Sequence, residues 1–170
     1  MSDATLLDSL KSRFGAAILN SEIARDEVTV FIARDQALEF FRALRDDPNL
    51  QFDFLTDVTA VDWIERKPRF EVVYQLNSLA RGHRLRVKIG VDGGDPWVHS
   101  VTGLWRSADW LEREAFDMFG IDFKGHPDLR RILMYDSFEG HPLRKDYNFQ
   151  KRQPIVPETD PVVRPLRPSR

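Results

Sequence analysis

The chain has 170 residues, 42% of them hydrophobic, which is enough for one domain with a substantial apolar core. Charged residues make up 31% but the formal net charge is only -2, so the chain lacks the basic field of a general nucleic-acid binder. Cysteine is absent, which excludes disulfides, a thiolate nucleophile, thiolate zinc sites and cysteine-ligated iron–sulfur clusters within this sequence.

The first ten residues carry Asp3 and Asp8 and no arginine, a pattern that disfavours a secretory signal or a mitochondrial transit peptide. No window approaches the ~18 consecutive apolar residues that a membrane span requires. We therefore expect a bacterial cytosolic protein that reaches a bilayer only through another subunit.

Helical spacing of apolar residues over 6–14 predicts a first helix. Alternating β-branched residues over 27–32 predict a strand, and 16–23 is a candidate partner for it. Asp35 is expected to cap a second helix that continues to Asp46.

Three further strand-like runs follow at 52–63, 70–78 and 83–91, and short polar turns join them. Such connections favour an antiparallel meander with one face covered by the first two helices. A third helix is predicted from an N-cap at Ser107 to Gly120, where a left-handed residue would end it. This order predicts an α+β fold, a two-layer sandwich of a mostly antiparallel sheet with helices on one face.

The composition changes near residue 150. Five prolines fall within 154–168, and prolines at that density prevent both a helix and a central strand. We therefore expect a domain over residues 1–150, followed by an extended proline-rich arm over 151–170 that is ordered only where a partner holds it.

The stretch from Trp110 to Phe149 is the most informative part of the sequence. An acidic helix is followed by two similar turns, Gly125-His126-Pro127 and Gly140-His141-Pro142. Glycine permits backbone conformations closed to other residues and proline fixes φ, so both triplets are expected to be rigid turns. Basic residues follow the turns, namely Arg130, Arg131, Arg144 and Lys145. Rigid, densely charged loops of this kind commonly carry function.

Two interpretations of this stretch compete. A divalent metal site would use the carboxylates of Glu114 and Asp117 with the rings of His126 and His141, but the spacing fits no zinc pattern. We favour an ion-pair network, with Arg113 and Asp117 four residues apart, that positions the Gly-His-Pro turns while each His ring donates to a nearby carbonyl or carboxylate. RNA binding is disfavoured because the nearby acids repel phosphate, whereas a carboxylate-bearing protein surface suits the basic residues.

The motifs of this stretch closely resemble the signature of one protein family. They are Glu112-Arg113-Glu114, Asp117 to Ile121, Phe123, His126 to Leu133, and the continuation GHPLRKDY. In this order they resemble the C subunit of bacterial NADH:quinone oxidoreductase, respiratory complex I. The resemblance extends from the first helix to about residue 157.

The resemblance implies a non-redox subunit of the peripheral arm, on the cytoplasmic side of the bacterial inner membrane. Its partners would be other complex I subunits, chiefly the D subunit, which forms much of the quinone site, and neighbouring iron–sulfur subunits. It implies no cofactor in this chain, with FMN and iron–sulfur clusters in partner subunits. The residues that mark the family or are expected to bind partners are Glu112, Arg113, Glu114, Asp117, Gly120, His126, Pro127, Arg130, Arg131, His141, Pro142, Arg144 and Lys145. The proline-rich arm would lie as a strap across a neighbour, and the chain would be the free-standing form of a protein that some bacteria fuse to the D subunit.

Two alternatives stay open from the sequence. Related subunits of ferredoxin-dependent dehydrogenases and membrane-bound hydrogenases resemble this chain as well, so the electron donor is not fixed. A different class, a stand-alone metal-dependent hydrolase, would use Glu114, Asp117 and the two histidines.

Overall fold

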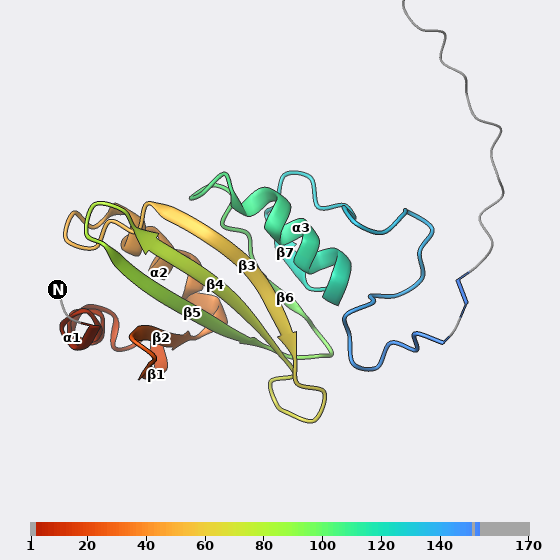
Figure 1. The fold of residues 1–170 in the computed structure, drawn as a ribbon, viewed down its shortest axis with the longest axis horizontal. Coiled ribbons are helices and arrows are strands. Elements are labelled where there is room, and N and C mark those ends of the chain that lie inside the picture. The colour runs from red at the N-terminus through yellow and green to blue at the C-terminus, as the bar shows by residue number, and fades with distance from the viewer. Residues whose placement is uncertain (1–2, 151, 154–170) are drawn as a thin grey trace, which may run out of the picture.

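The structure of the protein, a computed structural model, describes residues 3–150 and 152–153. These residues form three α-helices, a five-stranded sheet and a small second sheet (Figure 1). In chain order the elements are α1 (Asp3–Phe14), β1 (Ile18–Ala24), β2 (Glu27–Ile32), the 3-10 turn η1 (Arg34–Gln36), α2 (Ala37–Asp46), β3 (Phe54–Asp62), β4 (Phe70–Ser78), β5 (His83–Val91), β6 (Trp97–His99), α3 (Ala108–Phe119) and β7 (Asp122–Lys124).

The large sheet has the strand order β1-β2-β5-β4-β3. Strands β3, β4 and β5 form the predicted antiparallel meander, and β1 pairs antiparallel with β2 as predicted. A parallel pairing of β2 with β5 joins the β1–β2 pair to the meander and so forms one sheet. The predicted α+β fold with a mostly antiparallel sheet is therefore confirmed, with one parallel contact at its centre.

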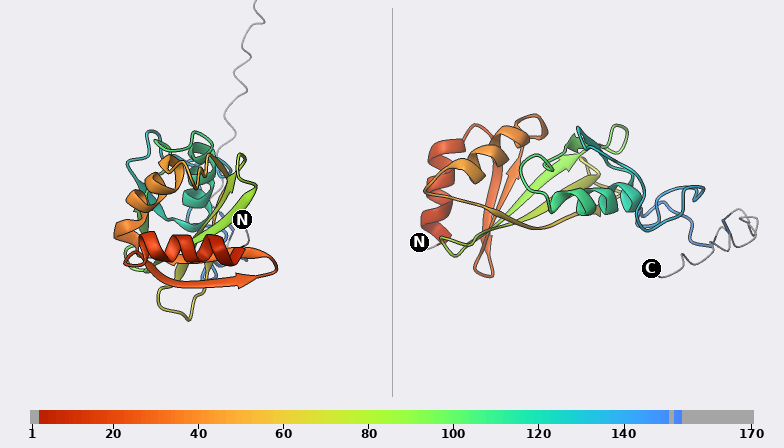
Figure 2. Two further views of the ribbon diagram at one scale, coloured as in Figure 1. Left: turned by 90° about the vertical axis from the view of Figure 1, so that its left-hand side faces the viewer. Right: turned by 90° about the horizontal axis from the view of Figure 1, so that it is seen from above.

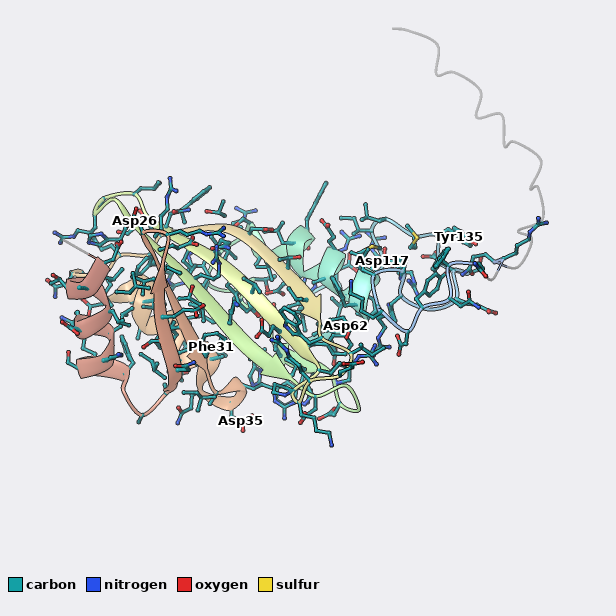
Figure 3. The ribbon with its side chains drawn as sticks, turned by 60° about the horizontal axis from the view of Figure 1, so that its bottom comes forward. Asp26, Phe31, Asp35, Asp62, Asp117 and Tyr135 are labelled. Atoms are coloured by element: carbon teal, nitrogen blue, oxygen red, sulfur yellow. The ribbon has the colours of Figure 1, made fainter. Side chains whose placement is uncertain are left out.

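The strands show which face of the sheet is covered. In β4, Phe70, Val72 and Tyr74 are buried, whereas Glu71 and Gln75 point to the other face and stay partly exposed. The buried strand residues form one core cluster with apolar residues of all three helices. The helices therefore cover one face, and none of the described helices covers the opposite face, which is turned toward the viewer in Figure 3.

Helix α3 also covers the core face, which the sequence pattern assigned to the first two helices. Its residues Ala115, Met118 and Phe119 are buried in the common core. The apolar stripe of α3 packs against β3, so it extends the helical layer along the sheet (Figure 2). The two-layer arrangement is retained.

The predicted N-cap at Asp35 is wrong, and the predicted N-cap at Ser107 is right in position but makes no capping bond. Asp35 lies within the turn η1 and α2 begins only at Ala37, with no capping bond from a side chain. Ser107 stands at the N-cap of α3, but its hydroxyl donates to the carbonyl oxygen of Leu55 at 2.9 Å instead of accepting from the helix. The prediction for the other end of α3 is confirmed, because Gly120 is left-handed with φ 72°.

Strands β6 and β7 were not predicted. They pair in parallel over three residues each, and β7 follows directly after α3. Beyond β7, residues 125–150 contain no described helix or strand and run past the C-terminal end of α3 (Figure 1). We call these residues the C-terminal segment.

The prediction for the proline-rich arm falls mostly on residues outside the described part of the chain. Of the arm, only Arg152 and Gln153 are described. The side chain of Gln153 donates to the carbonyl of Glu139 and the hydroxyl of Tyr147, and it accepts from the amide of Glu139. Among the described residues no helix has the length and apolar character that crossing a membrane would require.

Candidate functional site

The carboxylate of Asp117 organises the C-terminal segment. It projects from the last turn of α3 and is fully buried. One oxygen accepts from the guanidinium of Arg131 at 2.7 Å. The other accepts from the backbone amides of Ile132, Leu133 and Met134 at 3.1, 2.9 and 2.8 Å. One side chain therefore fixes the path of three consecutive loop residues.

The electrostatics of Asp117 favour its charged form. Burial by itself would raise its pKa, but hydrogen bonds from the amides of Met134 and Leu133, from Arg131 and from the amide of Ile132 outweigh burial and hold the pKa below its usual range. Asp117 is therefore ionised at neutral pH and stays a hydrogen-bond acceptor.

The two Gly-His-Pro turns are attached to opposite ends of α3. Nε2 of His126 donates to the carbonyl of Asp109 at 3.0 Å, because Nδ1 already accepts from the amide of Asp128. Nδ1 of His141 donates to the carbonyl of Asp117 at 2.9 Å. Burial lowers the pKa of His141, so its ring is neutral at neutral pH. Both rings make the structural contacts that we favoured over metal binding.

Glycine is required at the turn residues and at the end of α3. Gly125 and Gly140 have φ of 87° and 90°, in the region that favours glycine. At Gly120 a Cβ atom would also lie 2.5 Å from Nε2 of His141. The second turn can therefore pack on α3 only because position 120 has no side chain. Pro127 of the first turn is exposed and Pro142 of the second is half-buried.

A second buried carboxylate ties the C-terminal segment to the sheet. The side chain of Asp62, at the end of β3, is fully buried and accepts two hydrogen bonds from Arg69 at 2.8 and 2.7 Å. It also accepts from the amide of Lys145 at 2.8 Å, while Arg69 donates to Asp146 at 2.9 Å. The bonds from Arg69 are the main reason that the pKa of Asp62 lies below its usual range. Figure 3 shows Asp62 and Asp117 at the same end of the molecule.

The sequence reasoning missed the Asp62 cluster, although a signal was present. Val58, Ala60 and Asp62 alternate along β3 on the face that is buried, so an acidic residue occupies a core position. A buried charge needs a partner, and that requirement alone pointed to an ion pair.

Glu112 is the third buried carboxyl group. Its Oε1 accepts from the amide of Val101 at 2.7 Å, whereas its Oε2 and the hydroxyl of Tyr74 are buried and find no hydrogen-bond partner among the described residues. Burial, with a smaller contribution from Asp109, raises the pKa of Glu112 to about 7, against the opposing hydrogen bonds of Ser100 and Val101. This carboxyl group therefore titrates near neutral pH inside the core.

Glu114 and Asp117, the two carboxylates considered for a metal site, lie in different surroundings, because Glu114 is exposed and Asp117 is buried. The expected pairing of Asp117 with Arg113 is wrong. Arg113 donates to the carbonyls of Arg130 and Arg131, and Arg131 is the cation bound to Asp117. Within the described residues, no group of three or more His, Asp or Glu side chains is arranged to hold a metal ion.

The four basic residues expected to face a partner differ in their surroundings. The side chain of Arg130 is 70% exposed and pairs with Asp128. Arg131 is 17% exposed and is committed to Asp117. Arg144 is half-buried, with its guanidinium over the ring of Phe70, whereas Lys145 is exposed. A role of these residues in partner binding stays a prediction, and Arg130 and Lys145 have the most accessible charges of the four.

Large apolar side chains are also exposed around the C-terminal segment, and the sequence reasoning did not single them out. They are Trp110, Leu133, Tyr135, Leu143 and Phe149. The side chain of Leu133 is exposed although its backbone amide is bonded to the buried Asp117. Tyr135 is labelled in Figure 3, where it lies on this segment away from the sheet.

Comparison with known proteins agrees with the resemblance seen in the sequence. The family model for the 30 kDa subunit of respiratory-chain NADH dehydrogenase matches residues 30–153. The C subunit of NADH-quinone oxidoreductase from Citrifermentans bemidjiense is 55% identical over 141 residues, which cover 83% of this chain and 86% of the relative. The protein of the same name from Roseiflexus sp. is 49% identical over 146 residues, or 86% of this chain and 84% of the relative.

Solved structures show the same fold. A trypsin-resistant fragment (1-134) of Nqo5 is 34% identical and superimposes with a TM-score of 0.65 over 73% of this chain and 98% of the fragment. A chain of the membrane-bound sulfane sulfur reductase, an archaeal respiratory membrane complex, has a TM-score of 0.72 at 22% identity over 86% of this chain and 85% of its own length, which shows the fold alone. The chain therefore belongs to the family of the 30 kDa subunit of respiratory-chain NADH dehydrogenase, whose bacterial relatives are named as C subunits of NADH-quinone oxidoreductase.

Proposed function

We propose that this chain is a structural, non-redox subunit of the peripheral arm of a proton-translocating NADH:quinone oxidoreductase. In this role it docks on the D subunit, which forms much of the quinone site, beside subunits that carry iron–sulfur clusters. It supports electron transfer from NADH to quinone by holding those neighbours in place. The assembly lies on the cytoplasmic side of the bacterial inner membrane.

The observation that carries the proposal is the bonding of Asp117. A loop of irregular structure normally has many conformations, and fixing one of them costs conformational entropy. Here one buried carboxylate binds three consecutive amides and Arg131. The loop is thereby ordered before any partner binds. The entropic cost of ordering the loop therefore does not reduce the affinity for a partner.

The surface of the ordered loop is suited to protein contact. Leu133 and Tyr135 are exposed, and the guanidinium of Arg130 is nearby in sequence and also exposed. Aromatic residues, arginine and well-ordered apolar side chains are enriched among the residues that contribute most to protein interfaces. This composition favours a subunit interface over a small-molecule site.

The chemistry of the residues supports a role without electron transfer through this chain. The sequence has no cysteine to ligate an iron–sulfur cluster. FMN and the clusters of the complex are accordingly assigned to partner subunits. The family relationship favours NADH as the electron donor over the ferredoxin- or hydrogen-linked alternatives, because the similar bacterial proteins are named as C subunits of NADH-quinone oxidoreductase.

Charge reversal on the loop tests the proposal. Arg130→Glu should leave the melting temperature nearly unchanged, because its surface pair with Asp128 contributes about 1 kcal/mol or less. The variant should nevertheless lose the D subunit during affinity purification. Arg42→Glu is a matched control, since Arg42 is also an exposed arginine in a surface pair, with Glu39 on α2. Retention of the D subunit by Arg130→Glu at the level of the control would contradict docking through this loop.

A further inference from the structure

The loop between β3 and β4 carries basic residues without carboxylate partners. Residues 64–68 are exposed, and no ion pair is formed by Arg66 or Lys67 within the part of the chain that the structure describes. Two arginines of the neighbouring strands do have carboxylate partners, Arg69 with Asp62 and Arg86 with Glu27. Unpaired cations in an exposed loop are available to bind an external anion.

The same loop lies beside the C-terminal segment. The amide of Lys145 donates to the carboxylate of Asp62 at the base of the loop. Arg144 and Lys145 likewise form no ion pair with a described residue. The four cations Arg66, Lys67, Arg144 and Lys145 are therefore contributed by two neighbouring pieces of chain, with Glu65 as the exposed acid of the loop.

Two hollows flank the loop. One, of about 370 Å³, is lined by Asp62, Trp63, Arg66 and Lys145, among others. The other, of about 300 Å³, shares Trp63 and Arg66 and is otherwise mainly apolar, with Lys67 and Glu71 as its other charged residues. Each is of a size for individual side chains of a bound segment. We call the two hollows together the groove.

Trp63 lines both hollows. Its indole N–H is buried and has no acceptor among the described residues. The guanidinium of Arg66 lies over the indole ring at 3.9 Å from its centroid. This cation–π contact holds the charge of Arg66 where the two hollows meet.

We propose that this groove binds an acidic, extended segment of a neighbouring subunit. Carboxylates of that segment pair with Arg66 and Lys145. The inference rests on the proposed docking function and extends it to a second contact, formed by the β3–β4 loop.

The charges decide which segment fits the groove. The arm of this chain, 151–170, contains five basic residues (Lys151, Arg152, Arg164, Arg167, Arg170) and two acidic ones (Glu158, Asp160), a balance of +3. Like charges repel, so the arm is disfavoured as the occupant. A broad anionic surface such as a membrane or nucleic acid would be opposed by the net charge of -2 of the whole chain. A short acidic peptide segment matches both the local charge and the size of the hollows.

A paired charge reversal tests the contact. The variant Arg66→Glu with Lys67→Glu changes two exposed loop residues and should fold normally, which a thermal melt verifies. With a tagged full-length chain purified from native membranes, it should release neighbouring subunits at a salt concentration that the wild type withstands. The matched control is Lys11→Glu with Arg84→Glu, which reverses two exposed cations on α1 and β5. Equal salt resistance of the loop variant and the control would overturn the proposal.

A photo-crosslink identifies the occupant. The photoreactive amino acid p-benzoylphenylalanine is placed at position 64 of the full chain, because Ile64 is exposed and lines the first hollow without being one of the proposed cations. Irradiated in the purified assembly, it should form a covalent product with a segment of another subunit rich in Asp and Glu. A product with the arm of this chain, with lipid or with a segment lacking acidic residues, or no product, would refute the inference. Failure of the proposed function would look different, because the wild-type chain would then purify without any neighbouring subunit. That result would contradict both the proposed function and the contact through the groove.

Discussion

Packing of the second Gly-His-Pro turn against α3 requires a residue without a Cβ atom at position 120. Alanine at this position would have to adopt φ 72°, and its Cβ would meet the ring of His141 at 2.5 Å. Gly125 has a similar φ of 87° but has open space where a Cβ would be. The left-handed conformation costs alanine roughly 1–2 kcal/mol at either position. Only Gly120→Ala must also displace the second Gly-His-Pro turn.

We therefore expect Gly120→Ala to lower the free energy of unfolding by clearly more than Gly125→Ala. Urea unfolding of the two variants measures the difference, which isolates the contact between Gly120 and His141. Gly94→Ala is a neutral reference, because no atom lies within 4 Å of its Cβ position. If Gly120→Ala and Gly125→Ala are equally stable, the proposed packing of His141 on α3 is wrong.

Glu112 makes stability depend on pH. Its pKa is raised from the ordinary 4.5 to about 7 in the folded chain. Between these values the folded protein retains a proton that the unfolded chain has released. The stability that this proton contributes is fully present below pH 4.5 and is lost as the pH rises through about 7.

Glu112→Gln removes this titration. The free energy of unfolding of the variant minus that of the wild type should rise as the pH is raised from below 4.5 to above 7. The rise is at most roughly 3 kcal/mol, since one pKa unit corresponds to about 1.4 kcal/mol. Denaturant unfolding of both proteins across this range gives the comparison, and groups common to both, such as His141, cancel. A difference that does not change with pH would show that Glu112 is not protonated in the core.

Among the helices and strands, the sequence predicted those that have a recognisable pattern within their own residues. The three helices and the five strands of the large sheet each show a periodic apolar pattern or a turn residue, as in the alternation of β4. The parallel pairing of β2 with β5 and the small sheet of β6 and β7 have no such signal. Strands of three residues are too short to show periodicity, and pairing between distant strands depends on the whole fold.

The candidate site was predictable in position and in composition but not in its bonds. The glycines and prolines located the turns, and the charged residues were recognised as a network. The expected partner of Asp117 is Arg113, four residues away, whereas the observed partner is Arg131, fourteen residues away. Sequence spacing predicts side-chain neighbours only within a helix. Arg131 reaches Asp117 because the C-terminal segment runs past the C-terminal end of α3 (Figure 1).

The loop bonded to Asp117 should depend on its charge. Asp117→Asn keeps the size of the side chain but leaves the guanidinium of Arg131 without its carboxylate, so we expect a loss of about 3 kcal/mol in the free energy of unfolding. Hydrogen exchange at the amides of residues 132–134 should rise as well. Asp128→Asn, which removes an exposed carboxylate, is the control and should leave these amides protected. Unchanged exchange in Asp117→Asn would contradict the role given to this carboxylate.

At the scale of the whole molecule, we propose that the described domain folds independently of most of the arm. The contacts of Gln153 with Glu139 and Tyr147 mark where the described chain is still attached to the domain. Deleting residues 158–170 should leave the melting temperature of the isolated chain nearly unchanged. It should also make the assembled complex dissociate at lower salt, because the deleted residues carry three basic and two acidic side chains, a balance of +1 that suits an acidic groove on a partner. An unfolded truncated chain, or unaltered salt resistance, would contradict this division.

The central claim is that the chain acts as a subunit of NADH:quinone oxidoreductase and not as an enzyme by itself. Affinity purification of the tagged full-length chain from native membranes tests it most directly. The account predicts a multi-subunit assembly that contains FMN and iron–sulfur clusters and oxidises NADH, whereas the chain produced alone has no such turnover. A chain that purifies from membranes without other subunits, or that carries its own stoichiometric metal and catalytic activity, would contradict it.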